Sequence, residues 1–156
     1  THTTAKSSAA SDVYKRQSIQ SHFELTRDEQ TDRLLAAIVN PAVNVIGHPS
    51  GRKIGLRPGV VFDSDAVFVA AAETGTAIEI NSHLQRLDLA APLIRAAMQV
   101  EGLMFSIATD AHHTSELANI RWGVAQARKG WVPVSRVLNC LTLTEFSAFV
   151  AAKRSI

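Results

Sequence analysis

Three residues that can bind a metal ion stand directly after two short apolar runs. Asp110 and His112 follow the apolar run 103–108, and His48 follows the run 43–47. A carboxylate and an imidazole two residues apart can converge on one hard or borderline cation. His48 can then add a third ligand from a neighbouring strand end. The spacing therefore predicts a metal site, with a helix-capping Asp110 and a surface His112 as the alternative interpretation.

A basic loop and two polar strand residues are further candidates for a site. The loop 47–59 places Arg52 and Lys53 among four glycines, so that cations and backbone N–H groups can approach a phosphate without crowding. Glu79 lies inside an apolar run that leads to Asn81, and its carboxylate can orient a ligand histidine. The alternatives are a solvated connecting loop and a structural ion pair between Glu79 and an arginine.

The elements that would position these residues alternate along the chain. Near-continuous apolar runs, typical of buried parallel strands, occur at 43–47, 77–80 and 103–108. Helices are expected around them, at 26–39, 63–74, 92–102, 115–129 and 142–153. We therefore predict an α/β fold with about four parallel strands, whose carboxyl ends carry the polar residues. The sequence contains no GxGxxG or P-loop motif, which argues against those nucleotide-binding folds.

Composition sets further limits on function. With 156 residues, 46% of them hydrophobic, the chain is long enough for one ordinary core and is not a disordered sequence. Residues 18–156 hold 13 basic and 13 acidic residues, so any binding of an anion has to be local. No apolar run is long enough to span a bilayer. Cys140 is the only cysteine, which excludes an internal disulfide and a cysteine zinc site and fits a cytoplasmic protein.

The first seventeen residues differ from the rest of the sequence. Segment 1–17 is small and polar, without hydrophobic periodicity and without the apolar stretch of a signal peptide. Its end, Val13–Gln17, resembles a translated adapter of the kind used for sequencing libraries. We interpret 1–17 as a non-native tail, with a natural disordered tail as the alternative. On the first interpretation, the native protein continues upstream of about Ser18 and this chain is a fragment.

Four motifs in order carry a resemblance to a known family. They are Gly47-His48-Pro49-Ser50-Gly51-Arg52, Ile78-Glu79-Ile80-Asn81, Arg86-Leu87-Asp88-Leu89 and Thr109-Asp110-Ala111-His112. Together they resemble the C-terminal half of a PHP (polymerase and histidinol phosphatase) domain, in the version attached to bacterial and archaeal family X DNA polymerases. The resemblance covers about residues 18–153, and the domain would occupy 18–156.

This resemblance implies a distorted seven-stranded β/α barrel that holds up to three Mn²⁺ or Zn²⁺ ions. The polymerase-linked members hydrolyse phosphoesters at DNA 3′ ends, as 3′–5′ exonucleases and 3′-phosphatases. By position, His48, Asp110 and His112 correspond to metal ligands, whereas Arg52 and Asn81 correspond to positions for phosphate contact and site support. The implied partners are DNA 3′ ends, the N-terminal half of the domain and a polymerase region.

The sequence departs from the family pattern in two ways. Gln20 stands where a ligand histidine is expected, and glutamine is the poorer ligand for these ions. His22 is a candidate substitute, because it lies two residues on and shares a face of the expected strand. On the resemblance, we also expect the N-terminal half of the domain, with its His-x-His motif and a glutamate, to lie outside this sequence. We therefore expect the chain alone to be inactive, and to be poorly soluble or oligomeric because a core face is uncovered.

Two other functions remain open at this point. One is a stand-alone PHP phosphatase for a small phosphate ester such as histidinol phosphate. The other is a PHP module without metals that serves a structural role beside a polymerase, an interpretation that Gln20 supports.

Overall fold

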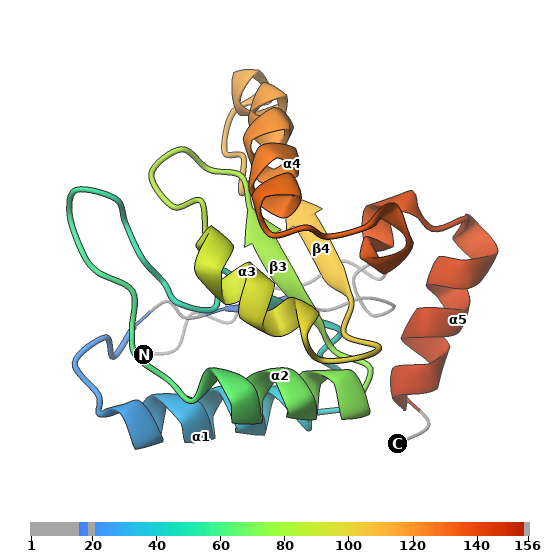
Figure 1. The fold of residues 1–156 in the computed structure, drawn as a ribbon, viewed down its shortest axis with the longest axis horizontal. Helices are drawn as coiled ribbons and strands as arrows, with labels where there is room; N and C mark the ends of the chain where they lie inside the picture. Colours follow the sequence, from blue (N-terminus) through green and yellow to red (C-terminus); the bar gives the residue numbers. More distant parts are fainter. Residues whose placement is uncertain (1–15, 19–20, 155–156) are drawn as a thin grey trace.

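Residues 16–18 and 21–154 are described by the computed structural model. They contain a four-stranded parallel sheet in the order β1-β2-β3-β4 (Figure 1). The strands are β1 Arg16–Ser18, β2 Val45–Gly47, β3 Ala77–Asn81 and β4 Phe105–Ala108. The predicted α/β class and parallel pairing are thereby confirmed, and each pair of neighbours in the sheet is also a pair of neighbours in the sequence.

All five predicted helices are present, although the third ends at Met98 and not near Gly102 as predicted. They are α1 Arg27–Ile38, α2 Ser64–Glu73, α3 Ala91–Met98, α4 Ile120–Lys129 and α5 Leu143–Arg154. At the start of α1, the Thr26 hydroxyl accepts from the backbone N–H of Glu29, and the Glu29 carboxylate accepts from the backbone N–H of Thr26. Asp63 caps α2 by accepting from the N–H of Ala66. These helix starts depend on local sequence and are confirmed.

The helix predicted over 115–129 begins later than expected. Residues Thr114–Asn119 form a 3-10 turn, and α4 begins at Ile120. The Glu116 carboxylate accepts from the backbone N–H groups of His112 at 2.7 Å and His113 at 3.2 Å. A 3-10 turn is wound more tightly than an α-helix, and such turns are frequent at the N-termini of α-helices, which accounts for the later start of α4.

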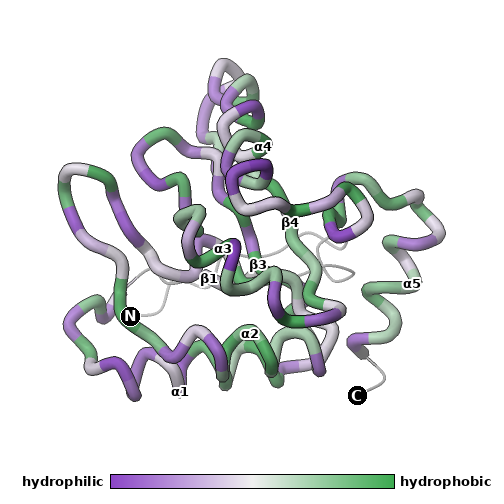
Figure 2. Tube along the Cα trace, in the orientation of Figure 1, coloured by the Kyte–Doolittle hydropathy of each residue, from purple (hydrophilic) through white to green (hydrophobic). Residues whose placement is uncertain are grey.

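The core lies where the helices cover the sheet. Strands β2 and β3 are buried along their lengths and β4 is buried up to Ile107, as the near-continuous apolar runs predict. Ile46, Ile78 and Phe105 are almost fully buried. Helices α1 and α2 lie side by side (Figure 1), and hydrophobic residues run along α2 (Figure 2). No helix in residues 21–154 has the length and apolar character needed to cross a membrane.

Strand β1 pairs with β2 from Arg16 to Ser18. Two of its residues therefore come from segment 1–17, whose interpretation as a non-native tail stays a prediction. The strand that was expected to carry Gln20 and His22 ends at Ser18. Gln20 lies outside the described residues, and His22 lies in a turn with φ 58°. A left-handed backbone at His22 breaks the strand geometry, so the predicted shared face does not extend to this residue.

Helix α4 packs closely enough on the sheet to require a glycine. A Cβ atom at Gly123 would lie 2.0 Å from Ser82 Oγ and 2.7 Å from Ile107 Cγ2.

We expect Gly123→Ala to lower the free energy of unfolding by about 1–3 kcal/mol, because overpacking outweighs the gain in helix propensity. Urea unfolding checks this, with Val124→Ala on the same helix as the matched control. A Gly123→Ala protein as stable as the parent would contradict the close packing.

Candidate functional site

The candidate residues stand at the carboxyl ends of three neighbouring strands. His48 follows β2, the loop 82–87 follows β3, and Asp110 and His112 follow β4. Because the strands are parallel, these ends meet at one edge of the sheet, where α/β proteins place their ligands. The sequence-predicted position of the site at the strand ends is therefore consistent with the fold.

Glu79 holds the turn that follows β2. The side chain of Glu79 is fully buried, and its Oε2 accepts from the backbone N–H of His48 at 2.5 Å. Asn81 Nδ2 donates to the same oxygen at 3.3 Å, and Asn81 Oδ1 accepts from the N–H of His83 at 2.9 Å. His48 has a positive φ of 30°, so its amide needs an acceptor outside regular structure. Glu79 and Asn81 thus support the backbone around two histidines.

Asp88 is a second buried carboxyl group with a structural contact to the same turn. Its oxygens accept from the backbone N–H of Ser50 at 3.1 Å and from the Ser50 hydroxyl at 2.8 Å. Burial raises the pKa of Asp88 above the ordinary 3.8, against the opposing effects of the Ser50 hydrogen bond and of Arg52. The sequence places Asp88 in a motif but indicates no role for it, since the contact with Ser50 spans 38 residues.

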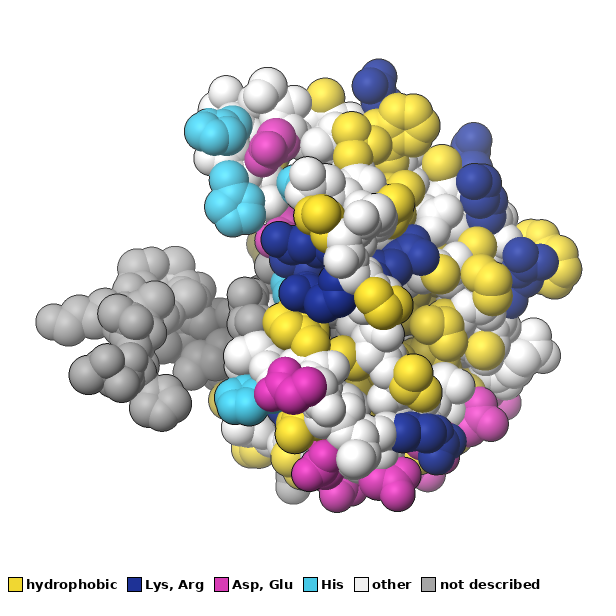
Figure 3. Space-filling model, turned by 90° about the vertical axis from the view of Figure 1, so that its left-hand side faces the viewer, with side chains coloured by type: hydrophobic (Ala, Val, Ile, Leu, Met, Phe, Trp, Pro, Cys, Tyr) yellow, Lys and Arg dark blue, Asp and Glu magenta, His cyan; other side chains and the backbone are white. Residues whose placement is uncertain are grey.

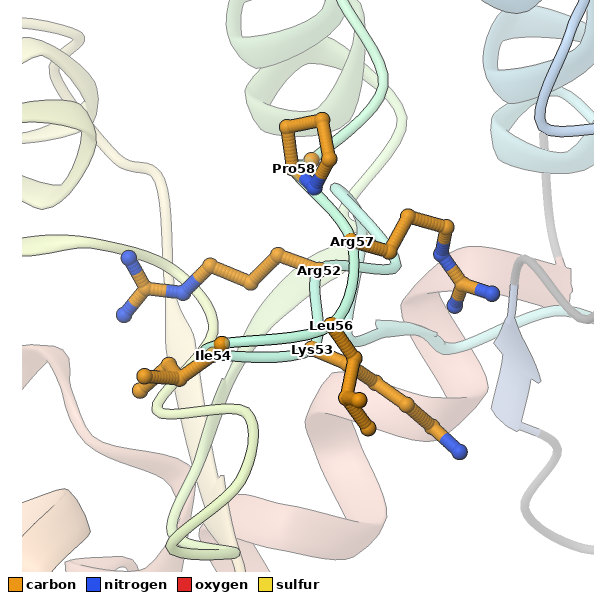
Figure 4. Close-up of a pocket in the computed structure, with 8 residues that line it drawn as sticks. Arg52, Lys53, Ile54, Leu56, Arg57 and Pro58 are labelled. Atoms are coloured by element: carbon orange, nitrogen blue, oxygen red, sulfur yellow. The ribbon is translucent and has the colours of Figure 1, made fainter.

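Arg52 and Lys53 have different surroundings, although the sequence predicts phosphate contact for both. Arg52 Nε donates to the carbonyl of Arg86 at 2.6 Å, and Arg52 Nη2 donates to the carbonyl of Leu87. Figure 4 shows Arg52 extending from one side of its loop, with Lys53 and Arg57 on the other. The Arg52 guanidinium therefore holds the loop after β3. Lys53 instead lines a polar pocket together with residues that follow β3 and β4.

One polar pocket brings predicted and unpredicted residues together. It is lined by Lys53, His83, Gln85, Arg86, Asp110 and His112. Arg86 Nε lies 3.3 Å from Asp110 Oδ2, and both side chains are mostly buried, with 15% and 16% of their surface exposed. Figure 3 shows histidine and basic side chains gathered on the face that the loops of Figure 1 form. Of the predicted site residues, the pocket contains Lys53, Asp110 and His112.

The hydrogen bonds of the pocket define what His112 can do. Its Nδ1 lies 2.8 Å from the carbonyl oxygen of Asp110. A carbonyl oxygen only accepts, so Nδ1 carries the proton and, in the neutral ring, Nε2 keeps its lone pair. Histidines that bind metals are typically oriented in this way. The backbone bond therefore prepares His112 either as a ligand or as a base.

The predicted metal ligands do not form one complete set in this chain. Among residues 16–18 and 21–154, no three histidine, cysteine, aspartate or glutamate side chains are grouped to hold an ion. Asp110 and His112 share the pocket, whereas His48 does not line it and is buried, with its backbone N–H donating to Glu79. His22 is exposed, and Gln20 is outside the described residues. The donor set present here therefore does not fit a three-ligand metal site by itself.

The raised pKa of Asp88 predicts a particular pH dependence of stability. As the pH rises from 3.8 through the higher pKa of the folded state, the unfolded chain releases this proton first. The parent should therefore lose stability relative to Asp88→Asn across that interval, because asparagine does not ionise. Chemical denaturation at a series of pH values measures the difference. A parent that gains stability relative to the variant with rising pH would show that Ser50 and Arg52 outweigh burial.

Comparisons with known proteins support the resemblance carried by the motifs. Over 133 residues, 85% of this chain, the sequence is 38% identical to the DNA polymerase/3′-5′ exonuclease PolX of Bacillus subtilis (strain 168), of which it covers 23%. Over 114 residues, 70% of the chain, it is 32% identical to a probable phosphatase of Edwardsiella ictaluri, of which it covers 44%. No family model matches the sequence. The chain thus spans less than half of each relative, and the similarities confirm that it resembles the PHP region of a family X DNA polymerase.

Proposed function

We propose that this chain is part of a metal-dependent phosphoesterase that acts on DNA 3′ ends, as the 3′–5′ exonuclease and 3′-phosphatase module of a family X polymerase. The observation that carries the proposal is the pocket in which Asp110 and His112 meet Lys53 and Arg86. The names of the two relatives, a polymerase with 3′-5′ exonuclease activity and a probable phosphatase, support the same reaction class.

The residues of the pocket match what phosphoester hydrolysis needs. Negative charge on the phosphoryl oxygens must be compensated, and Lys53 and Arg86 bring positive charge to the pocket. His112 keeps an Nε2 lone pair, and Asp110 is held in place by its ion pair with Arg86. The side chains are therefore suited to bind and orient a phosphate group.

The proposed cofactor is Mn²⁺ or Zn²⁺, with up to three ions in the complete domain. His48, Asp110 and His112 would contribute ligands, and the rest would come from outside the described residues, since these contain no three-ligand group. The proposed complete fold is the distorted seven-stranded barrel, to which this chain contributes the four-stranded part. A second candidate function is a phosphatase of small esters, which the similarity to the probable phosphatase favours.

Hydrolysis by the full-length protein of the source gene tests the proposal. With Mn²⁺, we expect it to shorten a 3′-labelled oligonucleotide and to release phosphate from a 3′-phosphorylated one. Asp110→Asn should lower both rates by about 100-fold or more, because even outer-shell partners of metal ligands contribute 10- to 100-fold.

Asp65→Asn, a carboxylate of the first turn of α2, is the matched control and should retain activity. Hydrolysis of a small phosphomonoester without action on DNA would favour the second candidate. A folded full-length protein that hydrolyses neither substrate would contradict the phosphoesterase proposal and favour a structural module.

A further inference from the structure

The pocket contains three hydrogen-bond donors that come from two loops. Lys53 belongs to the loop after β2, while His83 and Arg86 belong to the loop after β3. A backbone hydrogen bond of 2.6 Å from the N–H of Ile54 to the carbonyl of Gln85 ties the loops together. Arg52 adds a second tie through the carbonyls of Arg86 and Leu87. The three donors are therefore held on a joined frame, which lowers the cost of ordering them around a ligand.

His83 is oriented as a donor. The backbone N–H of Gln85 donates to His83 Nδ1 at 3.2 Å, so Nδ1 carries no proton and Nε2 does. The N–H of His83 is itself held by Asn81 Oδ1. This assignment is the opposite of that of His112, whose Nδ1 donates to a carbonyl. The pocket thus has one imidazole with a donor Nε2–H and one with an Nε2 lone pair.

Arg86, which lines the same pocket, has an unused donor. Its Nε is paired with Asp110, but its Nη1 is buried and makes no hydrogen bond to any residue that the structure describes. A buried cationic donor without an acceptor costs more than a neutral one, and such groups are rare in native proteins. An oxyanion bound in the pocket would supply the missing acceptor.

Two carboxylates lie close to the donors of the pocket. Asp110 is paired with Arg86. Glu116, which also interacts with the charges of His83 and His113, accepts from the backbone N–H groups of His112 and His113, and these bonds lower the pKa of its carboxyl group. Among the described residues, Lys53 forms no salt bridge with a carboxylate, so its ammonium is available to an anion in the pocket.

We propose that Lys53, His83 and Arg86 form a site for the terminal phosphate of a phosphomonoester. A terminal phosphate presents three non-bridging oxygens to three donors, whereas a phosphodiester presents two and carries less charge. This inference rests on the proposed function, because it specifies the substrate class of the same pocket. It adds His83, which none of the family motifs contains. It also assigns phosphate contact to Lys53 and not to its neighbour Arg52.

Phosphate binding by the full-length protein tests the site without hydrolysis. The probes are inorganic phosphate and a trinucleotide with or without a 3′-phosphate, titrated calorimetrically in the presence of a metal chelator. We expect Lys53→Ala and His83→Asn each to weaken binding of inorganic phosphate by about tenfold or more, since each removes one donor to an anion. The trinucleotide with a 3′-phosphate should bind at least about tenfold more tightly than its 3′-hydroxyl counterpart.

Matched controls are Lys129→Ala on α4 and His113→Asn, both at exposed positions that do not line the pocket. Both should bind phosphate as the parent does, and thermal unfolding shows whether each variant is folded. Absence of phosphate binding, or unchanged binding in both folded pocket variants, would overturn the inference. Equal affinity for the two trinucleotides would overturn the preference for a terminal phosphate. Phosphate binding by a parent protein that hydrolyses neither substrate would contradict only the proposed function. Hydrolysis by the parent, with phosphate binding unchanged in both pocket variants, would contradict only this inference.

Discussion

Two buried carboxyl groups hold the turn after β2, and the rest of the site depends on that turn. Glu79 accepts from the amide of His48, and Asp88 accepts from the amide and hydroxyl of Ser50. These amides lie outside regular structure, and a buried N–H without an acceptor costs roughly 1–3 kcal/mol. Satisfying them fixes the path of the chain into the loop that carries Arg52 and Lys53. Placing this loop therefore requires the burial of the Asp88 carboxyl group, which disfavours its ionised form and raises its pKa.

The same frame explains how a neutral chain can present a local site for an anion. Lys53, His83 and Arg86 reach one pocket only because the loops after β2 and β3 are joined by backbone and Arg52 hydrogen bonds. The loop after β4 brings Asp110 and His112 to the same place. Because the described residues contain no three-ligand group, we propose that the remaining ligands of the metal site come from outside the described residues.

Local sequence predicts the elements well and the contacts of the site less well. The Thr26 capping box and the buried strands follow from short-range patterns, and the position of Asp110 follows from the rule for strand ends. Arg52 and Lys53 are neighbours in one loop, so no sequence pattern distinguishes the one that bonds to carbonyls 34 and 35 residues away. The donor role of His83 depends on a hydrogen bond from one backbone amide, which no sequence pattern indicates. The position of His22 likewise depends on the left-handed backbone at that residue.

The central claim is that this chain supplies part of a metal phosphoesterase site. The most direct test is the metal content of the purified full-length protein, measured by mass spectrometry after dialysis against Mn²⁺ or Zn²⁺. We expect about two or three ions per polypeptide in the parent, fewer in Asp110→Ala, and the parental number in Asp65→Ala. A folded full-length protein that retains no ion, or an Asp110→Ala protein that retains the parental number, would contradict it.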